Sequence, residues 1–97
     1  MAATKENAVK RKLKKHLDEL GAYHFSPQSG IFGRSGIADV IGCYKGRFFA
    51  LECKAGGNTT TALQEKELQK VRDRGGFACV VDETNVDLIA ARLMIGD

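Results

Sequence analysis

Residues 38–54, ADVIGCYKGRFFALECK, decide the fold that we expect, because they contain two strand patterns joined by a short turn. Both patterns, at 38–44 and 47–54, are rich in apolar, β-branched and aromatic residues, which favour strands. Lys45 and Gly46 lie between them, and a two-residue link that ends in glycine is typical of a β-hairpin. Such a turn pairs Tyr44 with Arg47, and every further pair follows by one step outward along each strand.

This register brings two carboxylates together. Asp39 and Glu52 are the only acidic residues between Gly21 and Lys54, and both interrupt apolar strands. The hairpin pairing places them directly opposite each other on one face, with Cβ atoms roughly 4.5–5.5 Å apart. Lys54 lies two residues after Glu52 and therefore projects from the same face. An unpaired buried carboxylate costs several kcal/mol, so the pair needs a cation, a hydrogen-bond donor or water.

A divalent metal is one way to satisfy these groups. Two carboxylates and the main-chain carbonyl of Cys53 make an oxygen donor set that suits Mg²⁺ or Mn²⁺. Lys54 beside a metal-bound water can orient or deprotonate it, or offset charge in a phosphoryl transition state. The alternative is that Lys54 only forms salt bridges with Asp39 and Glu52, because a D…ExK combination is common. A two-carboxylate glycosidase is a further option that leaves the lysine unexplained.

The remaining patterns predict an α/β domain around the hairpin. Helical spacing predicts helices over residues 4–20, 62–74 and 84–94. Strands are expected at residues 22–25 and 77–82. We expect Thr4 to cap the first helix, and Thr84 to cap the last with Asp87 at its third position. The order α-β-β-β-α-β-α in 97 residues predicts one domain over residues 1–97.

Charge is distributed unevenly along the chain. Residues 1–54 hold ten Lys and Arg against five Asp and Glu, whereas residues 55–97 hold five against seven. A basic half suggests a polyanionic partner such as nucleic acid. Lys10 and Lys14 on the polar face of the first helix either are solvated or contact phosphates.

A long loop separates the first strand from the hairpin. Residues 26–37, SPQSGIFGRSGI, contain three glycines and the only proline. Loops of this length in so small a domain are usually functional or mobile. Its Gln28, Ser29 and Arg34 are candidates for contacting a DNA backbone.

The composition also indicates where the protein resides. No run of eighteen apolar residues is present, and the N-terminus is charged where a signal peptide would be apolar, so we expect no membrane partner and a cytoplasmic location. The three cysteines lack CxxC spacing and sit in apolar runs, which favours a reducing compartment and gives no zinc-site pattern.

The stretch from Gly33 to Asp82, GRSGIADVIGCYKGRFFALECKAGGNTTTALQEKELQKVRDRGGFACVVD, resembles the virus-type replication–repair nuclease (VRR-NUC) domain of the PD-(D/E)XK nuclease superfamily. Asp39 matches the motif aspartate, Glu52 and Lys54 match the ExK pair, and Gln64 matches a glutamine that opens the following helix. Glu6 matches a glutamate of the N-terminal helix, so the similarity covers roughly residues 6–82. Ala38 stands where the family usually has proline, which affects the entry into the strand more than the chemistry.

This resemblance implies a restriction-endonuclease-like fold, a central mixed sheet flanked by helices. It further implies an Mg²⁺- or Mn²⁺-dependent endonuclease that cuts branched DNA, similar to the stand-alone Holliday junction resolvases of phages and bacteria, which act as homodimers. Glu6 then binds a second metal or outer-shell water, and Gln64 holds Lys54 or a phosphate; equally, both are ordinary helix-surface residues. A non-catalytic DNA-binding module, a flap or single-strand nuclease, and a small structural dimer are the other hypotheses.

Overall fold

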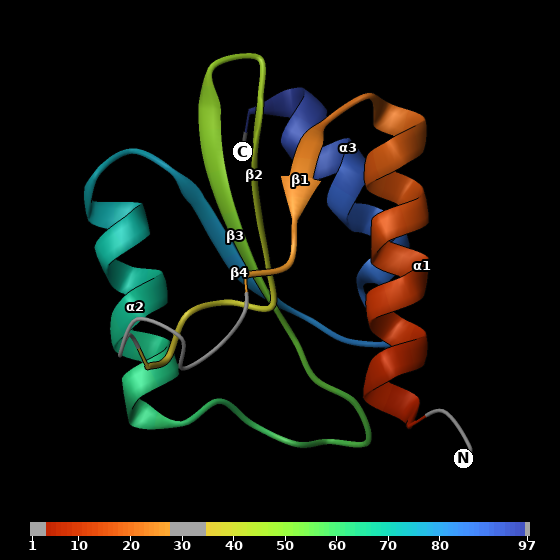
Figure 1. Cartoon of the computed structure of the whole chain (residues 1–97), viewed down its shortest axis with the longest axis vertical. Coiled ribbons are helices and arrows are strands. Elements are labelled where there is room, and N and C mark those ends of the chain that lie inside the picture. The colour runs from red at the N-terminus through yellow and green to blue at the C-terminus, as the bar shows by residue number, and fades with distance from the viewer. Residues whose placement is uncertain (1–3, 28–34, 97) are drawn as a thin grey trace.

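The computed structural model describes residues 4–27 and 35–96, which form a four-stranded sheet between two layers of helices (Figure 1). The elements are α1 (Lys5–Leu20), β1 (Tyr23–Phe25), β2 (Val40–Tyr44), β3 (Arg47–Cys53), α2 (Ala62–Asp73), β4 (Phe77–Val81), the 3₁₀ turn η1 (Val86–Leu88) and α3 (Ile89–Ile95). The strand order is β1-β2-β3-β4, with β1, β2 and β3 antiparallel and β4 parallel to β3. The predicted α/β class and order of elements are confirmed.

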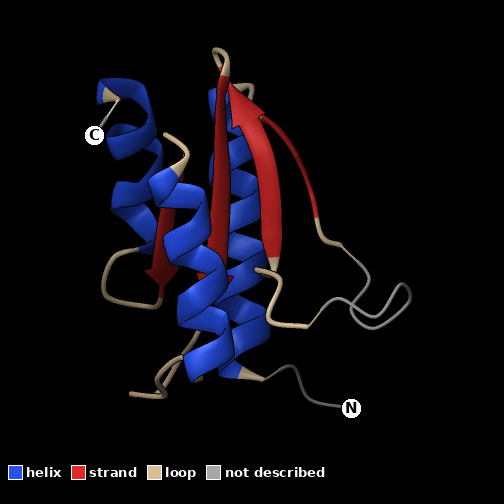
Figure 2. Ribbon diagram, turned by 90° about the vertical axis from the view of Figure 1, so that its left-hand side faces the viewer, coloured by secondary structure: helices blue, strands red, loops and turns tan. Residues whose placement is uncertain are grey.

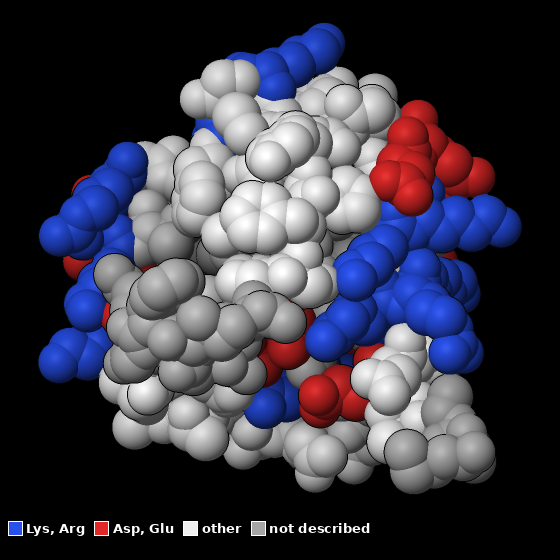
Figure 3. Space-filling model, in the orientation of Figure 1, with Lys and Arg blue, Asp and Glu red and all other residues white. Residues whose placement is uncertain are grey.

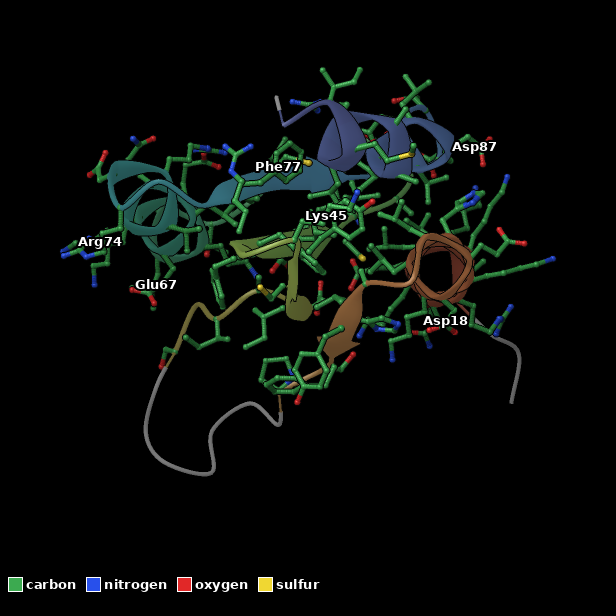
Figure 4. All side chains as sticks on the ribbon, turned by 90° about the horizontal axis from the view of Figure 1, so that it is seen from above. Asp18, Lys45, Glu67, Arg74, Phe77 and Asp87 are labelled. Carbon is green, nitrogen blue, oxygen red and sulfur yellow. The ribbon has the colours of Figure 1, made fainter. Side chains whose placement is uncertain are left out.

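The sheet is buried unequally on its two faces. Viewed from above, α2 covers one face while α1 and α3 lie against the other (Figure 4). The larger core fills the α1 and α3 side, where its fully buried side chains include Leu13, Leu17, Phe49, Leu51 and Ile89. A smaller core lies under α2 and consists of Ala38, Ala50, Leu68 and Ala78. Because α2 packs on β3 and β4, it leaves β1 and part of β2 uncovered beside it (Figure 2).

The hairpin turn sets the register of β2 and β3. Lys45 and Gly46 both have positive φ, 49° and 83°, as a two-residue type I′ turn requires. Tyr44 therefore pairs with Arg47, and the pairing continues outward as far as Val40 with Leu51. The register predicted from the turn is confirmed.

Gly42 allows β1 to approach β2 closely. It pairs with His24, and a Cβ atom added at Gly42 would lie 1.9 Å from the carbonyl oxygen of Tyr23. Any side chain at this position would push β1 away from the sheet. The short edge strand β1 is therefore held in place by a glycine in its neighbour.

The capping residues match the prediction for α1 but not for the last helix. The Thr4 hydroxyl accepts a hydrogen bond from Asn7 N at 3.0 Å, as an N-cap does. Thr84 does not cap a helix, because its N–H and hydroxyl both donate to Asp82 Oδ1 in a turn after β4. The chain then forms η1 before α3 begins at Ile89, so the predicted start at residue 84 is wrong. Asp87 lies in η1 and not in α3.

The structure also bears on the expectations for membrane helices and for the cysteines. In the described ranges, 4–27 and 35–96, no helix has the length and apolar character needed to cross a membrane. All three cysteines are free, with Cys53 and Cys79 buried and Cys43 exposed. The first two therefore act as small core residues, as expected.

Candidate functional site

Asp39 and Glu52 come together where β2 begins and β3 ends. Glu52 lies in β3, and Asp39 directly precedes β2, so the register of Val40 with Leu51 places the two acids opposite each other. Asp39 Oδ2 accepts a hydrogen bond from the main-chain N–H of Cys53 at 2.8 Å. If β2 were longer, a main-chain carbonyl of β2 would accept this hydrogen bond. Here the Asp39 carboxylate accepts it instead. The predicted pairing of the acids is confirmed by this geometry.

Glu52 is the only buried charged residue in the described part of the chain, with 3% of its surface exposed. Its Oε2 accepts from Gln64 Nε2 at 3.2 Å and lies 3.5 Å from Lys54 Nζ. Its Oε1 is buried and has no hydrogen-bond partner among the described residues. A buried carboxylate oxygen normally has a partner, so this oxygen is the acceptor of the site that a hydrogen-bond donor or a cation would satisfy.

The environment of Glu52 favours its protonated form. Burial, followed by the negative charge of Asp39 and a hydrogen bond with it, raises the pKa of Glu52 from 4.5 to about 7, although Lys54 acts in the opposite direction. A raised pKa of this kind is typical of functional sites, where charge is assembled for a ligand. The pair therefore requires positive charge to be fully ionised.

Each carboxylate has its own lysine. Lys54 lies beside Glu52, and Lys10 Nζ from α1 lies 3.6 Å from Asp39 Oδ1. Only 28% of the Lys10 side chain and 14% of the Lys54 side chain are exposed. Lys10 was predicted to contact DNA, and its pairing with Asp39 was missed. Its place in the sequence, three residues before Leu13 and seven before Leu17, carried the signal that it lies beside the buried stripe of α1.

Gln64 belongs to the site through Glu52. It is the third residue of α2, and its Oε1 accepts from the N–H of Thr61 at 2.9 Å in a capping box. That bond fixes the amide, so its Nε2 points to Glu52. Gln64 thus contacts the Glu52 carboxylate, and the expected contact with Lys54 or a phosphate stays a prediction.

Of the other predicted residues, Glu6 and Lys14 lie on α1 and the rest lie outside the described ranges. Glu6, in the first turn of α1, lines a pocket of about 370 Å³ with Ala55, Gly56 and Asn58. No hydrogen bond or ion pair within residues 4–27 and 35–96 joins Glu6 to Asp39 or Glu52, so its role as a metal ligand stays a prediction. Lys14 is half-buried one turn after Lys10 on α1. Gln28, Ser29 and Arg34 fall outside the described residues.

The donors present fit a hard divalent cation. Nowhere in the described ranges do three His, Cys, Asp or Glu side chains gather as a metal-ligating group, so the acid pair supplies two ligands at most. Mg²⁺ is commonly held in this way, by one or two carboxylates with water in its remaining positions. The unpartnered Glu52 Oε1 is an oxygen that such an ion would satisfy. A contribution from the Cys53 carbonyl stays a prediction.

Basic side chains flank the surface around the site. They gather over α1 on one side and over α2 on the other, with mostly uncharged side chains between them and acidic side chains toward the lower part of the view (Figure 3). No model of a known protein family matches this chain, and no curated protein is significantly similar to it. The acid pair, its two lysines and the basic side chains around them are the groups that determine the chemistry of the site.

Proposed function

We propose that this protein is a metal-dependent endonuclease that hydrolyses phosphodiester bonds in branched DNA, similar to a Holliday junction resolvase. The observation that carries the proposal is the pairing of Asp39 with the buried Glu52, with Lys54 against Glu52. Together with the resemblance of residues 6–82 to VRR-NUC domains, it supports a PD-(D/E)XK nuclease fold.

The residues of the site have separate tasks in this proposal. Asp39, Glu52 and the Cys53 carbonyl would hold Mg²⁺ or Mn²⁺, an ion that polarises a phosphate and lowers the pKa of bound water. Lys54 orients the attacking water and offsets negative charge on the phosphate. Gln64 holds Glu52 in place through the capping box of α2.

The substrate is inferred from charge and symmetry. The excess of Lys and Arg in residues 1–54, including Lys10 and Lys14 on α1, supports binding of a phosphate backbone. A four-way junction has near two-fold symmetry, so two copies of the chain would present two sites for paired cuts. We therefore propose a homodimer acting on branched DNA.

A cleavage panel tests the proposal. We expect the purified protein to cut a four-way junction in Mg²⁺ or Mn²⁺. It should cut flap, duplex and single-stranded DNA more slowly than the junction, and it should cut none of them in EDTA. If the flap or the single strand were cut faster than the junction, that DNA would be the preferred substrate and the junction would not. If the protein bound DNA but cut none of the four DNAs in either metal, the proposed enzyme activity would be contradicted. The hypothesis of a non-catalytic DNA-binding module would then remain.

Lys10→Met is expected to strengthen Mn²⁺ binding about two- to fivefold, because the lysine competes with a cation for Asp39. Isothermal titration calorimetry of the DNA-free protein measures this change. Lys15→Met is the matched control, since Lys15 is an exposed lysine of the same helix. An equal gain in both variants would show that only the net charge matters, and weaker binding by Lys10→Met would contradict the competition.

A further inference from the structure

Three exposed aromatic side chains lie on the face of the sheet that carries the acid pair. Tyr23, Phe25 and Phe48 are 69%, 46% and 46% exposed. The rings of Tyr23 and Phe25 meet edge to face, with centroids 6.0 Å apart. Isolated exposed apolar residues need no explanation, but a group on one strand face does.

The strand register shows that these aromatic residues lie on the same face of the sheet as the acid pair, in the rows next to it. Tyr23 pairs with Cys43, which pairs with Phe48, and this is the first row across three strands. The next row toward the site is Phe25, Ile41 and Ala50. Since directly paired residues share a face, the row after that is Asp39 and Glu52. Rows on one face are about 7 Å apart, so Phe25 lies one row from the acid pair.

The helices leave this face open at its β1 side. Ile41 and Ala50 pack with the core under α2, which identifies the face as the α2 side of the sheet. A pocket of about 230 Å³ between α2 and the hairpin, lined in part by Ile41 and Phe48, continues this face. The uncharged surface at the β1 edge lies between the basic side chains of α1 and α2 (Figure 3).

We infer that Tyr23 and Phe25 form a stacking platform for unpaired bases of the strand that the site engages, an inference that rests on the proposed function. Flat aromatic side chains bordered by lysines fit the two parts of a single strand, because bases stack on rings while phosphates contact the amines. Paired bases within a duplex are already stacked on one another, so the platform selects DNA with unpaired nucleotides beside the cut. The platform therefore favours branched DNA that exposes unpaired bases beside the cut, such as a flap or a junction opened at its branch point, over intact duplex.

The test compares two strands of equal charge. A labelled oligothymidylate and an abasic phosphodiester strand of the same length are titrated in EDTA, so that no cutting occurs. We expect the thymidylate to bind about 5- to 50-fold more tightly. Tyr23→Leu and Phe25→Leu, which keep an apolar side chain, should remove most of this preference and leave binding of the abasic strand unchanged. Met94→Ala, at an apolar residue of α3 that is 65% exposed, is the control and should change nothing.

Equal affinity for the two strands, or a preference that survives both leucine variants, would overturn the inference. The inference would also be overturned if the leucine variants turned a dimer into monomers and kept the preference for thymidylate. That result would mean that Tyr23 and Phe25 contact a second copy of the chain and not bases. The same proteins are assayed for junction cutting in Mg²⁺. A base preference without cutting contradicts the nuclease alone, and cutting without a base preference contradicts the platform alone.

Discussion

Lys54→Met is expected to slow metal-dependent DNA cutting by about 10²- to 10⁴-fold, the range that a positioned acid, base or charge-stabilising group contributes. The Lys54 side chain is 14% exposed and lies against Glu52, so no solvent cation can take its place with the same geometry. Methionine keeps the length and apolar stem of lysine and removes only the amine. Asp39→Asn should have an effect at least as large, because it removes the charge of one of the two carboxylates.

The measurement is a single-turnover cleavage rate on a four-way junction, with DNA binding measured separately in EDTA. Binding should remain largely intact in both variants, because each changes a single group at the phosphate that is cut, while most of the DNA backbone is expected to contact other residues. Lys66→Met is the matched control, because Lys66 is an exposed lysine of α2. Cutting at near wild-type rates by both Lys54→Met and Asp39→Asn would contradict the proposed enzyme.

Glu52→Gln is expected to stabilise the metal-free fold by about 1–2 kcal/mol at pH 8 while abolishing cutting. The wild-type protein must bury an ionised Glu52 beside Asp39 at that pH. A neutral amide of the same shape keeps the hydrogen bond from Gln64 and removes the repulsion. In a domain of this size, 1 kcal/mol corresponds to roughly 4–8 °C in Tm.

The sign of the pH dependence follows from the raised pKa of Glu52. Its value is about 7 in the folded protein against 4.5 ordinarily, so between these values the folded state binds more protons than the unfolded state. The free energy of unfolding of the wild type therefore falls as the pH rises from about 4.5 to 7. Glu52→Gln lacks this contribution, and the difference between the two proteins should appear over that interval.

Thermal or denaturant unfolding at several pH values in EDTA measures this difference. Glu65→Gln, at an exposed position of α2, should stay within about 0.5 kcal/mol of the wild type. Mn²⁺ should then stabilise the wild type and not Glu52→Gln. A destabilised Glu52→Gln at pH 8 would show that the ionised carboxylate contributes to the fold.

The part of the site that could be predicted depends on local geometry. Lys45 and Gly46 fix the turn, the turn fixes the register, and the register alone places Asp39 opposite Glu52. Every step is between residues that are close in sequence or directly paired. The helix and strand patterns succeeded for the same reason, since each depends on a period within one segment.

The parts that were missed depend on contacts between distant segments or on competing local bonds. Lys10 reaches Asp39 only because α1 packs against the sheet beside β1 and β3, and the pattern within α1 does not tell which residues of the sheet it meets. Gln64 contacts Glu52 because the Thr61 cap holds its amide. The last helix begins late because Asp82 captures both donors of Thr84, and this turn competes with the predicted cap.

The type I′ turn of the hairpin sits at the opposite end of β2 and β3 from the acid pair, so its length acts on the chemistry from a distance (Figure 1). One amino acid inserted there would leave the pairing intact if the loop simply became longer, but if the pairing slipped by one residue, Glu52 would face the side of the sheet opposite Asp39. The turn therefore influences the acid pair only through the pairing of β2 with β3, from the far end of both strands.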